Sequence, residues 1–216
     1  MILQSFQNRL NTLKSNGEHI QYVLDIGAYR GDFTETIKSV WPFAIIRQIE
    51  ADDRQQQFLQ DNAIIALLGN EIKDDVDFYT LSENSITTGS SIFKELTHHY
   101  SDVSTVVIKK SMTTIDFLHK KHKFYGNWKE HGLIKIDTQG SELLILEGAT
   151  DFINTAKPRY ILLECSVMKY NQGAPMISDV YTRMNQLGYT TYDIFDLSYT
   201  ANNQLLQMDV LFKRNE

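Results

Sequence analysis

The sequence predicts an α/β fold, a doubly wound and mostly parallel sheet that ends in an antiparallel hairpin. Short, nearly continuous apolar strands alternate with helical segments along the chain, which is typical of a sheet covered by helices on both faces. The last two strands, Tyr189–Phe195 and Leu205–Phe212, are joined by a polar loop without a helix. They should therefore pair antiparallel at one end of the sheet. No linker or repeat interrupts residues 1–216, so we expect a single domain.

The first third of the chain predicts one helix followed by strand–helix units. Apolar residues at helical spacing predict an amphipathic helix within residues 1–17. A capping box formed by Asp32 and Glu35 predicts the start of a second helix, and Asp52 is expected to cap a third. The strands of this part are expected at Tyr22–Gly27, Phe43–Glu50 and Ala63–Leu68.

The remainder of the chain continues the alternation after a less regular middle part. The predicted helices lie at Thr114–Lys121, Ser141–Glu147 and Pro175–Leu187. The predicted strands before the final hairpin lie at Val76–Tyr79, Thr105–Lys109, Leu133–Asp137 and Tyr160–Glu164. A polar loop, Ser82–Ser91, separates the first two of these strands.

Charge and composition exclude several classes of protein. The chain of 216 residues carries 21 Lys and Arg against 27 Asp and Glu, a net charge of −6, which argues against a nucleic-acid partner. A single cysteine, Cys165, excludes a disulfide framework and is expected to be a small buried residue. No apolar stretch approaches the roughly 20 residues of a membrane span, and the first residues lack a secretory signal pattern. We therefore expect a cytoplasmic protein.

The first strand ends in a glycine turn that favours a cofactor without phosphate. A dinucleotide fingerprint would place glycines at positions 27, 29 and 32, but Tyr29 and Asp32 occupy two of them. Asp32 puts a negative charge where a helix start would otherwise attract phosphate. S-adenosylmethionine, with its sulfonium and ammonium groups, fits this turn better. The expected contacts of the turn are Asp25 near the methionine ammonium, and Gly27, Ala28, Tyr29 and Gly31 around it.

The next two strand ends complete the predicted cofactor site. Glu50 lies at the end of the second strand, nineteen residues after Gly31, where an acid can accept hydrogen bonds from both ribose hydroxyls. Leu68 and Gly69 end the third strand and are expected to flank the adenine. The alternative is that the glycines merely form a tight connection between a strand and a helix.

The segment Leu133–Ala149 resembles the signature of the FkbM-type methyltransferase family. The resemblance extends over nearly the whole chain, through Val23–Thr34, Ile49–Glu50, Thr113–Asp116, Leu162–Glu164, Tyr192–Leu197 and Gln207–Phe212. It implies a class I, Rossmann-like S-adenosylmethionine-dependent fold and O-methylation, commonly of sugar hydroxyls in glycans or secondary metabolites. The chain departs from the family at Gln139, where many members carry an acid, and at Ala51, where proline is common.

Three carboxylates at the ends of the later strands are the candidates for the chemistry. Methyl transfer requires an aligned acceptor oxygen and removal of its proton, and Asp137, Glu142 and Glu164 are placed for these tasks. Asp137 could instead cap the following helix, with Lys135 neutralising it, and Glu142 could be structural. Three carboxylates at one rim could also hold a divalent cation, although their spacing does not indicate a metal site.

Other residues have a functional and a structural interpretation. His98 and His99 could supply a base, or form a solvated pair. Lys120–Lys123 could bind an anionic glycan, or be the solvated end of a helix. Tyr170–Pro175 is expected to form a loop beside the acceptor. The predicted function is O-methylation of a sugar hydroxyl on a glycan, glycoconjugate or glycosylated metabolite. Its rivals are an NAD-dependent oxidoreductase and a non-catalytic binding module with the same fold.

Overall fold

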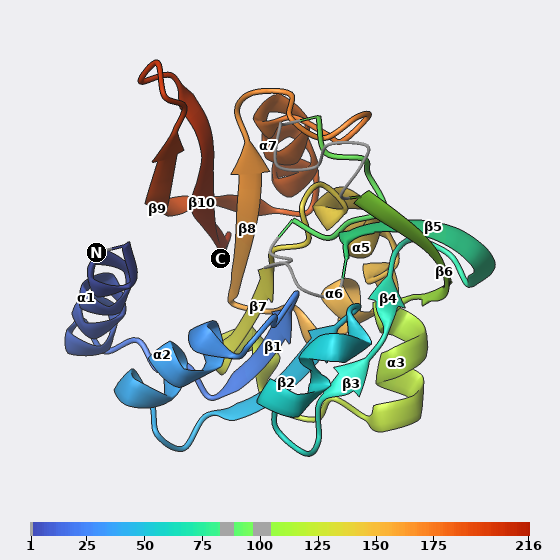
Figure 1. The fold of residues 1–216 in the computed structure, drawn as a ribbon. Coiled ribbons are helices and arrows are strands. Elements are labelled where there is room, and N and C mark those ends of the chain that lie inside the picture. Colours follow the sequence, from blue (N-terminus) through green and yellow to red (C-terminus); the bar gives the residue numbers. More distant parts are fainter. Residues whose placement is uncertain (1, 83–88, 97–104) are drawn as a thin grey trace.

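A seven-stranded sheet forms the centre of the molecule (Figure 1). The computed structural model describes residues 2–82, 89–96 and 105–216. The strand order is β3-β2-β1-β7-β8-β10-β9, in which β10 runs antiparallel to both of its neighbours and the other neighbouring pairs are parallel. The bounds are β1 (Tyr22–Ile26), β2 (Ile45–Glu50), β3 (Ile64–Ile65), β7 (Gly132–Ile136), β8 (Tyr160–Ser166), β9 (Tyr189–Tyr199) and β10 (Leu205–Arg214). The mostly parallel sheet with its C-terminal hairpin confirms the predicted fold class.

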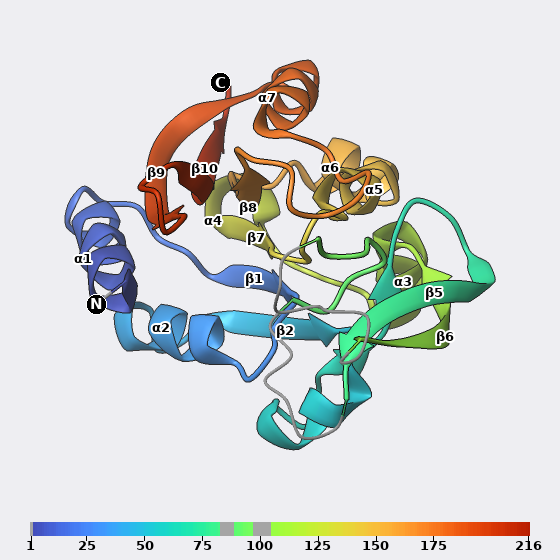
Figure 2. The same cartoon turned by 45° about the horizontal axis from the view of Figure 1, so that its top comes forward.

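Helices cover both faces of this sheet. Successive side chains of a strand point to opposite faces, so a strand that is apolar throughout contributes to two hydrophobic clusters. In β8, Tyr160 and Leu162 join one hydrophobic cluster, while Ile161 and Leu163 join the other. The first cluster lies under α1 (Ile2–Ser15) and α2 (Asp32–Val40). The second lies under α3 (Ile115–His122), α4 (Trp128–His131), α5 (Glu142–Glu147), α6 (Thr150–Ala156) and α7 (Ile177–Gln186). Figure 2 shows α1 and α2 on the side of β1 opposite to α5 and α6.

The predicted third strand is wrong in one respect, because it is divided between two sheets. Ile64 and Ile65 pair with β2, and the chain then bends at Ala66, whose N–H donates to Glu50 O at 2.8 Å. The next two residues form β4 (Leu67–Leu68), which pairs with β6 (Thr105–Thr113). Together with β5 (Lys73–Leu81), they make a three-stranded sheet in the order β4-β6-β5. This small sheet covers one side of the main sheet's carboxyl end.

Several helix predictions also need correction. Gly31, in the left-handed conformation with φ 86°, precedes α2, and no side chain caps that helix, so the predicted capping box is wrong. Asp52 does cap the next segment by accepting from Arg54 N, but the segment is a short 3-10 helix, η1 (Asp53–Phe58). The short helices α4 and α6 were not predicted, and α7 spans fewer residues than the predicted Pro175–Leu187.

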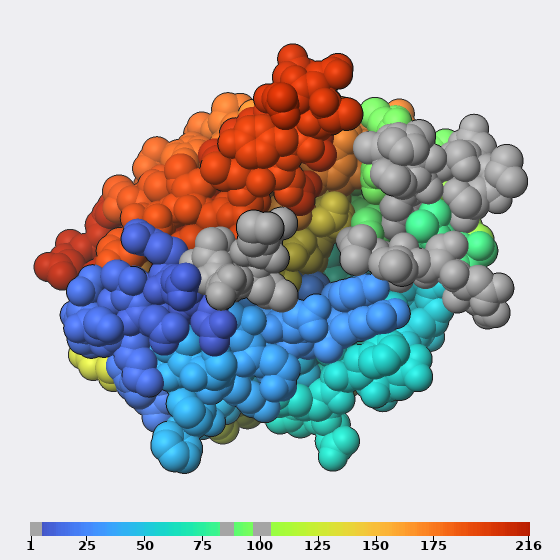
Figure 3. Space-filling model, turned by 60° about the vertical axis from the view of Figure 1, so that its left-hand side comes forward, coloured from blue at the N-terminus to red at the C-terminus, as the bar shows by residue number. Residues whose placement is uncertain are grey.

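The first helix of the chain packs against its last hairpin. α1 contacts α2 and β9, and Figure 3 shows the N-terminal segment in blue beside the C-terminal strands in red. Arg9 Nε donates to Asp193 Oδ2 at 2.7 Å and links α1 to β9. Within the described part of the chain, every helix is too short or too polar to cross a bilayer.

Candidate functional site

A cavity of about 890 Å³ lies beyond the carboxyl ends of β1, β2, β7 and β8. This is the edge where ligands bind in open α/β sheets, and the volume is in the range of small-molecule sites. Six of the residues predicted for the site line it: Gly27, Tyr29, Glu50, Leu68, Asp137 and Glu164. Five do not belong to the lining: Asp25, Ala28, Gly31, Gly69 and Glu142.

The turn after β1 touches the strand end that carries Asp137. Gly27 has a φ of 71°, and a Cβ atom at this position would lie 1.8 Å from the Asp137 carbonyl oxygen. The Asp137 N–H also donates to Ile26 O at 3.2 Å. A glycine is therefore required at position 27 by both conformation and space. The close approach that Gly27 allows is therefore to the backbone of Asp137.

Glu50 is held in place by two backbone amides. Its Oε2 accepts from Tyr29 N and its Oε1 from Asp52 N, each at 2.8 Å. Burial raises the pKa of Glu50, and these two hydrogen bonds oppose that rise. A carboxylate oxygen has two lone pairs, so each oxygen can accept one more hydrogen bond from the cavity. Glu50 can thus receive a pair of hydroxyl groups without losing its own supports.

The wall beside Glu50 is apolar. Ala66, Leu67 and Leu68, at the junction of β3 and β4, line the cavity together with Phe78 and Leu81 of β5. A flat heterocycle can lie against such side chains while its ribose reaches Glu50. The residues at this end of the cavity could therefore hold an adenosine, and the assignment of Glu50 to the ribose and of Leu68 to the adenine stays a prediction.

Asp25 lies behind the cavity and not in it. Its side chain is fully buried, and its Oδ2 accepts from Thr34 Oγ1 at 2.7 Å. Thr34 Oγ1 in turn accepts from Gln48 Nε2 at 3.1 Å, so Asp25 belongs to a network between β1, β2 and α2. Burial raises the pKa of Asp25, while Lys135 and Thr34 oppose the rise. The geometry does not support the predicted contact between Asp25 and a methionine ammonium.

Asp137 faces the cavity beside a buried lysine. Its side chain is 38% exposed, and its Oδ2 lies 3.3 Å from Lys135 Nζ. Gln139 Nε2 lies 3.4 Å from the other carboxylate oxygen. The residue that precedes α5 is Ser141, so Asp137 does not cap this helix. The structure thus places Asp137 on the cavity side and pairs it with Lys135.

Glu164 accepts hydrogen bonds from two glutamine side chains. Its Oε2 accepts from Gln139 Nε2 at 2.7 Å, and its Oε1 accepts from Gln207 Nε2 at 2.6 Å. Burial raises the pKa of Glu164 well above its usual range, and the nearby carboxylates of Asp137 and Asp209 raise it further. Asp209 is the cross-strand neighbour of Glu164, and its own pKa is raised by burial and by Asp137. Both carboxyl groups are therefore harder to ionise than free ones.

Gln207 and Leu206 are cavity residues that the sequence analysis missed. They belong to β10, whose insertion between β8 and β9 brings them beside Glu164. Tyr170, from the predicted acceptor-side loop, also lines the cavity and donates its hydroxyl to Gln207 Oε1 at 2.6 Å. The pairing order of the final strands was the missing information, since the residues themselves carry no catalytic pattern.

Glu142 supports the loop between Asp137 and α5. Its Oε1 accepts from Thr138 N at 2.9 Å and from Gly140 N at 3.1 Å. The side chain is buried and lies outside the cavity lining. The geometry therefore favours the structural interpretation of Glu142 over the catalytic one.

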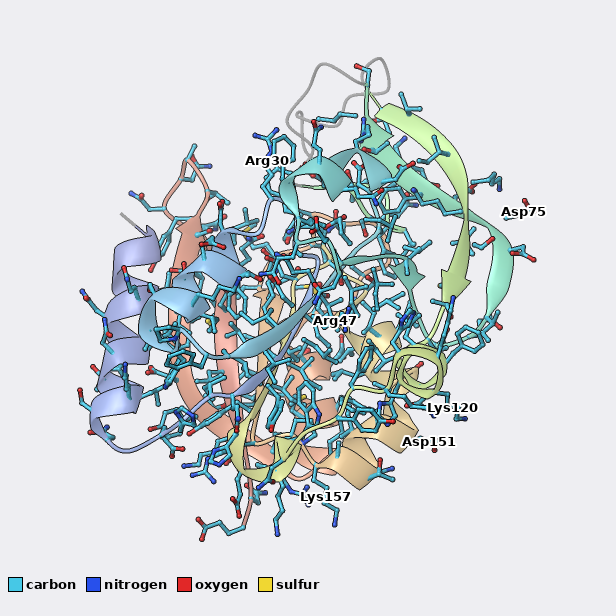
Figure 4. The ribbon with its side chains drawn as sticks, turned by 90° about the horizontal axis from the view of Figure 1, so that it is seen from below. Arg30, Arg47, Asp75, Lys120, Asp151 and Lys157 are labelled. Atoms are coloured by element: carbon cyan, nitrogen blue, oxygen red, sulfur yellow. The ribbon has the colours of Figure 1, made fainter. Side chains whose placement is uncertain are left out.

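The other candidates contribute little to the cavity. Among the described residues, no cluster of His, Cys, Asp and Glu is arranged to hold a metal ion. Cys165 is buried, and burial raises the pKa of its thiol. His98 and His99 lie outside the described residues. Lys120 projects from the end of α3 and lies 3.9 Å from Asp151 of α6, with both side chains largely exposed (Figure 4).

Comparison with known proteins points to one family. A family model described as the methyltransferase FkbM domain matches residues 25–191. The comparison with curated proteins found no match. The solved structure of an FkbM methyltransferase from Methylobacillus flagellatus KT is similar, with 16% identity and a TM-score of 0.48 over 88% of this chain. The match covers 43% of that protein, so the present chain spans less than half of its length.

Two further structures cover most of both chains. A precorrin-6y C5,15-methyltransferase from Geobacter metallireducens GS-15 matches with a TM-score of 0.50 and 9% identity, over 99% of this chain and 89% of the other. A magnesium protoporphyrin IX methyltransferase from Synechocystis PCC 6803, solved with bound S-adenosylmethionine, matches with a TM-score of 0.49 and 11% identity, over 99% and 79%. At these identities the likeness concerns the fold.

Proposed function

Because the chain belongs to the FkbM methyltransferase family, we propose that it methylates a hydroxyl oxygen of a neutral carbohydrate or of a glycosylated small molecule. The family identifies it as an S-adenosylmethionine-dependent methyltransferase. The observation that supports the acceptor oxygen is the position of Asp137, which faces the cavity beside the cofactor turn and holds an ion pair with Lys135. The family match gives no support to the alternative of an NAD-dependent oxidoreductase.

The residues of the cavity fit this cofactor in two places. Glu50 would accept hydrogen bonds from the ribose hydroxyls, and the apolar wall at Leu67 and Leu68 would contact the adenine. The methionine part would then extend toward the turn at Gly27. When bound, the cofactor supplies a methyl group already activated by a positively charged sulfur.

Asp137 would remove the proton of the acceptor. As the acceptor oxygen takes up the methyl group that a bound cofactor would supply, its hydroxyl proton would pass to a carboxylate oxygen of Asp137. The Lys135 ammonium lies 3.3 Å from this carboxylate and supplies its countercharge. Glu164 also lines the cavity, and its carboxyl group can form a hydrogen bond with a second hydroxyl of the acceptor and so orient it.

The charges of the cavity favour an uncharged acceptor. Its lining includes the carboxylates of Glu50, Asp52, Glu95, Asp137 and Glu164. Among the described lining residues there is no Lys, Arg or His. An anionic group 4 Å from an ionised carboxylate would be repelled by about 4 kcal/mol at an effective dielectric constant of 20, and by less where Arg54 or Lys135 supplies a countercharge. Gln139, Gln207 and Tyr170 supply amide and hydroxyl groups that suit a polyhydroxylated molecule.

The test is a panel of acceptors offered with methyl-labelled cofactor. Neutral mono- and oligosaccharides are compared with uronic acids and sugar phosphates of the same ring configuration. We expect label to enter neutral sugars as an alkali-stable ether. In the Asp137→Asn variant, turnover should fall roughly 10²–10⁴-fold, with the affinity for S-adenosylhomocysteine nearly unchanged by calorimetry. Comparable methylation of the acidic sugars, or label on nitrogen, would contradict the proposed acceptor.

A further inference from the structure

Lys135 occupies an unusual place for a charged residue, on a buried face of the central sheet. It is 8% exposed and points to the side of the sheet that α2 covers. In the register of the sheet, Gln48 of β2, Asp25 of β1 and Lys135 of β7 are consecutive neighbours across three strands. The phenyl ring of Phe33, from α2, lies 5.7 Å from the ammonium. A cation at such a position is tolerated only with close partners.

The ammonium has three oxygen partners, and two of them belong to the functional site. Lys135 Nζ donates to Gly27 O, in the cofactor turn, at 2.8 Å. It lies 3.3 Å from Asp137 Oδ2 and 3.6 Å from Asp25 Oδ1. Burial alone would lower the pKa of Lys135, but the charges of Asp137 and Asp25 outweigh this and raise it. Lys135 therefore remains charged at every physiological pH.

These contacts connect the turn that faces the cofactor to the carboxylate that faces the acceptor. The backbone of Asp137 is already fixed, by its hydrogen bond to Ile26 and its contact with Gly27. Its side chain is held by Lys135 and by Gln139. A rotation of the carboxylate away from Lys135 would leave the buried ammonium with one fewer countercharge.

We propose that Lys135 is a positioning residue that ties the Asp137 carboxylate to the carbonyl of Gly27, and so fixes the orientation and charge of the acceptor-side base relative to the cofactor turn. This inference rests on the proposed function, in which Asp137 accepts the hydroxyl proton. The charged groups that face Lys135 are Asp25 from β1, Asp137 at the end of β7, and Asp209 of β10, with Glu50 and Glu164 at the cavity beyond them.

The test measures the ionisation of Asp137 directly and needs no acceptor. Protein labelled with ¹³C at the aspartate carboxyl carbons is titrated by NMR, and the Asp137 signal is assigned by its loss in Asp137→Asn. In Lys135→Met, which keeps the length of the side chain without its charge, the midpoint of Asp137 should be higher than in the wild-type protein. In the matched control Asp25→Asn, Lys135 keeps its contacts with Gly27 and Asp137, and the midpoint should not rise.

Lys135→Met leaves the buried carboxylate of Asp25 without its countercharge, which by itself destabilises the fold. The double variant Asp25→Asn/Lys135→Met removes both charges and is titrated as well. An upward shift of the Asp137 midpoint in this double variant, relative to Asp25→Asn, supports the proposal. Equal midpoints in the two proteins would overturn it. Calorimetry with S-adenosylhomocysteine on the wild-type protein distinguishes a failure of the role proposed for Lys135 from a failure of the proposed function. If binding is normal and the midpoints are equal, the role of Lys135 is wrong while the methyltransferase function stands; if there is no binding, the proposed function itself fails.

Discussion

The carboxylate of Glu50 is held by Tyr29 N and Asp52 N before any ligand arrives, so its oxygens need no rearrangement to accept two hydroxyl groups. Hydrogen bonds to a charged acceptor contribute roughly 1.5–3 kcal/mol each. Glu50→Gln places an amide N–H₂ group against one of the backbone donors and removes the charge. We expect it to weaken the binding of S-adenosylhomocysteine at least about tenfold in calorimetry.

Asp52→Asn is the matched control for this prediction, since Asp52 also lines the cavity but its carboxylate is already engaged by the Arg54 guanidinium. Its effect on affinity should be clearly smaller. If Asp52→Asn weakened binding as much as Glu50→Gln, the ribose would have to be assigned to another residue.

Gly27 gives a second prediction at the scale of one residue. Gly27→Ala introduces a methyl group 1.8 Å from Asp137 O and forces a φ of 71° on alanine. The combined strain and overlap should lower the free energy of unfolding by roughly 2–5 kcal/mol. Gly188→Ala is a control with a similar φ of 78° and nothing within 4 Å of the added Cβ atom, so it isolates the conformational cost. Urea unfolding of the two variants should differ clearly, and equal losses would show that the contact with Asp137 is relieved at no cost.

At the scale of elements, one carboxylate connects three segments that are distant in the sequence. Glu18, between α1 and β1, accepts from Arg159 Nε at 2.8 Å and from Arg159 Nη2 and Lys213 Nζ at 2.9 Å. Burial would raise the pKa of Glu18, but these hydrogen bonds outweigh it and lower the pKa from 4.5 to about 2. Through Arg159 and Lys213, Glu18 links the start of β8 and the end of β10 to the segment before β1.

The depressed pKa of Glu18 predicts a specific dependence of stability on pH. A carboxyl whose pKa is lower in the folded state stabilises the fold above its unfolded pKa and loses this contribution as pH falls through its folded pKa. The contribution should therefore be complete above about pH 5 and disappear between pH 4.5 and about 2. Glu18→Gln should cost roughly 2–3 kcal/mol in urea unfolding at pH 7 and progressively less in that window.

Glu35→Gln is the control for Glu18→Gln, because the carboxyl group of Glu35 is exposed on α2. Its effect on unfolding at pH 7 should stay within about 0.5 kcal/mol, as is usual for surface substitutions. A difference between wild type and Glu18→Gln that stayed constant down to pH 2 would argue that packing, and not charge, explains the loss.

The elements also show what a sequence pattern can and cannot predict. Strands with continuous apolar runs, such as those at Tyr22 and Tyr160, were predicted because both faces of the sheet are covered. The bend at Ala66 was not predicted, since Ile64–Leu68 is equally apolar on both sides of it and the division depends on which sheet each pair joins. The start of α2 was predicted with the wrong cap. Asp32 is the first residue of the helix, and the cap position before it is taken by Gly31, which has a left-handed conformation and no side chain.

At the scale of the whole molecule, binding of the cofactor product should stabilise the fold. A ligand at about 100 times its Kd that binds only the folded state adds about 2.7 kcal/mol. For a domain of this size this corresponds to roughly 5–10 °C in Tm. We expect such a shift with S-adenosylhomocysteine and none with NAD at the same concentration, measured by differential scanning fluorimetry.

The absence of a shift with S-adenosylhomocysteine would favour the remaining rival, a module that keeps the fold without the activity. A shift with NAD alone would contradict the family assignment of the cavity.

The candidate site was predictable where a single strand end carries the function, and not where two distant segments meet. Glu50 ends β2 and Asp137 directly follows β7, so their common edge followed from topology. Asp25 was placed in the cavity wrongly, because alternation along β1 directs its side chain under α2. Gln207 could not be found at all without knowing that β10 lies beside β8.

The position of β10 constrains the order in which the sheet can form during folding. β10 lies between β8 and β9, although both precede it in the sequence. During synthesis, β9 therefore emerges before the strand to which it pairs, and the edge of β8 stays open until residues 205–214 have left the ribosome. The wall of the cavity that contains Leu206 and Gln207 closes last. A nascent chain can bury much of its core around β1 and β7 early, but it becomes competent to hold an acceptor only after β10 has been added.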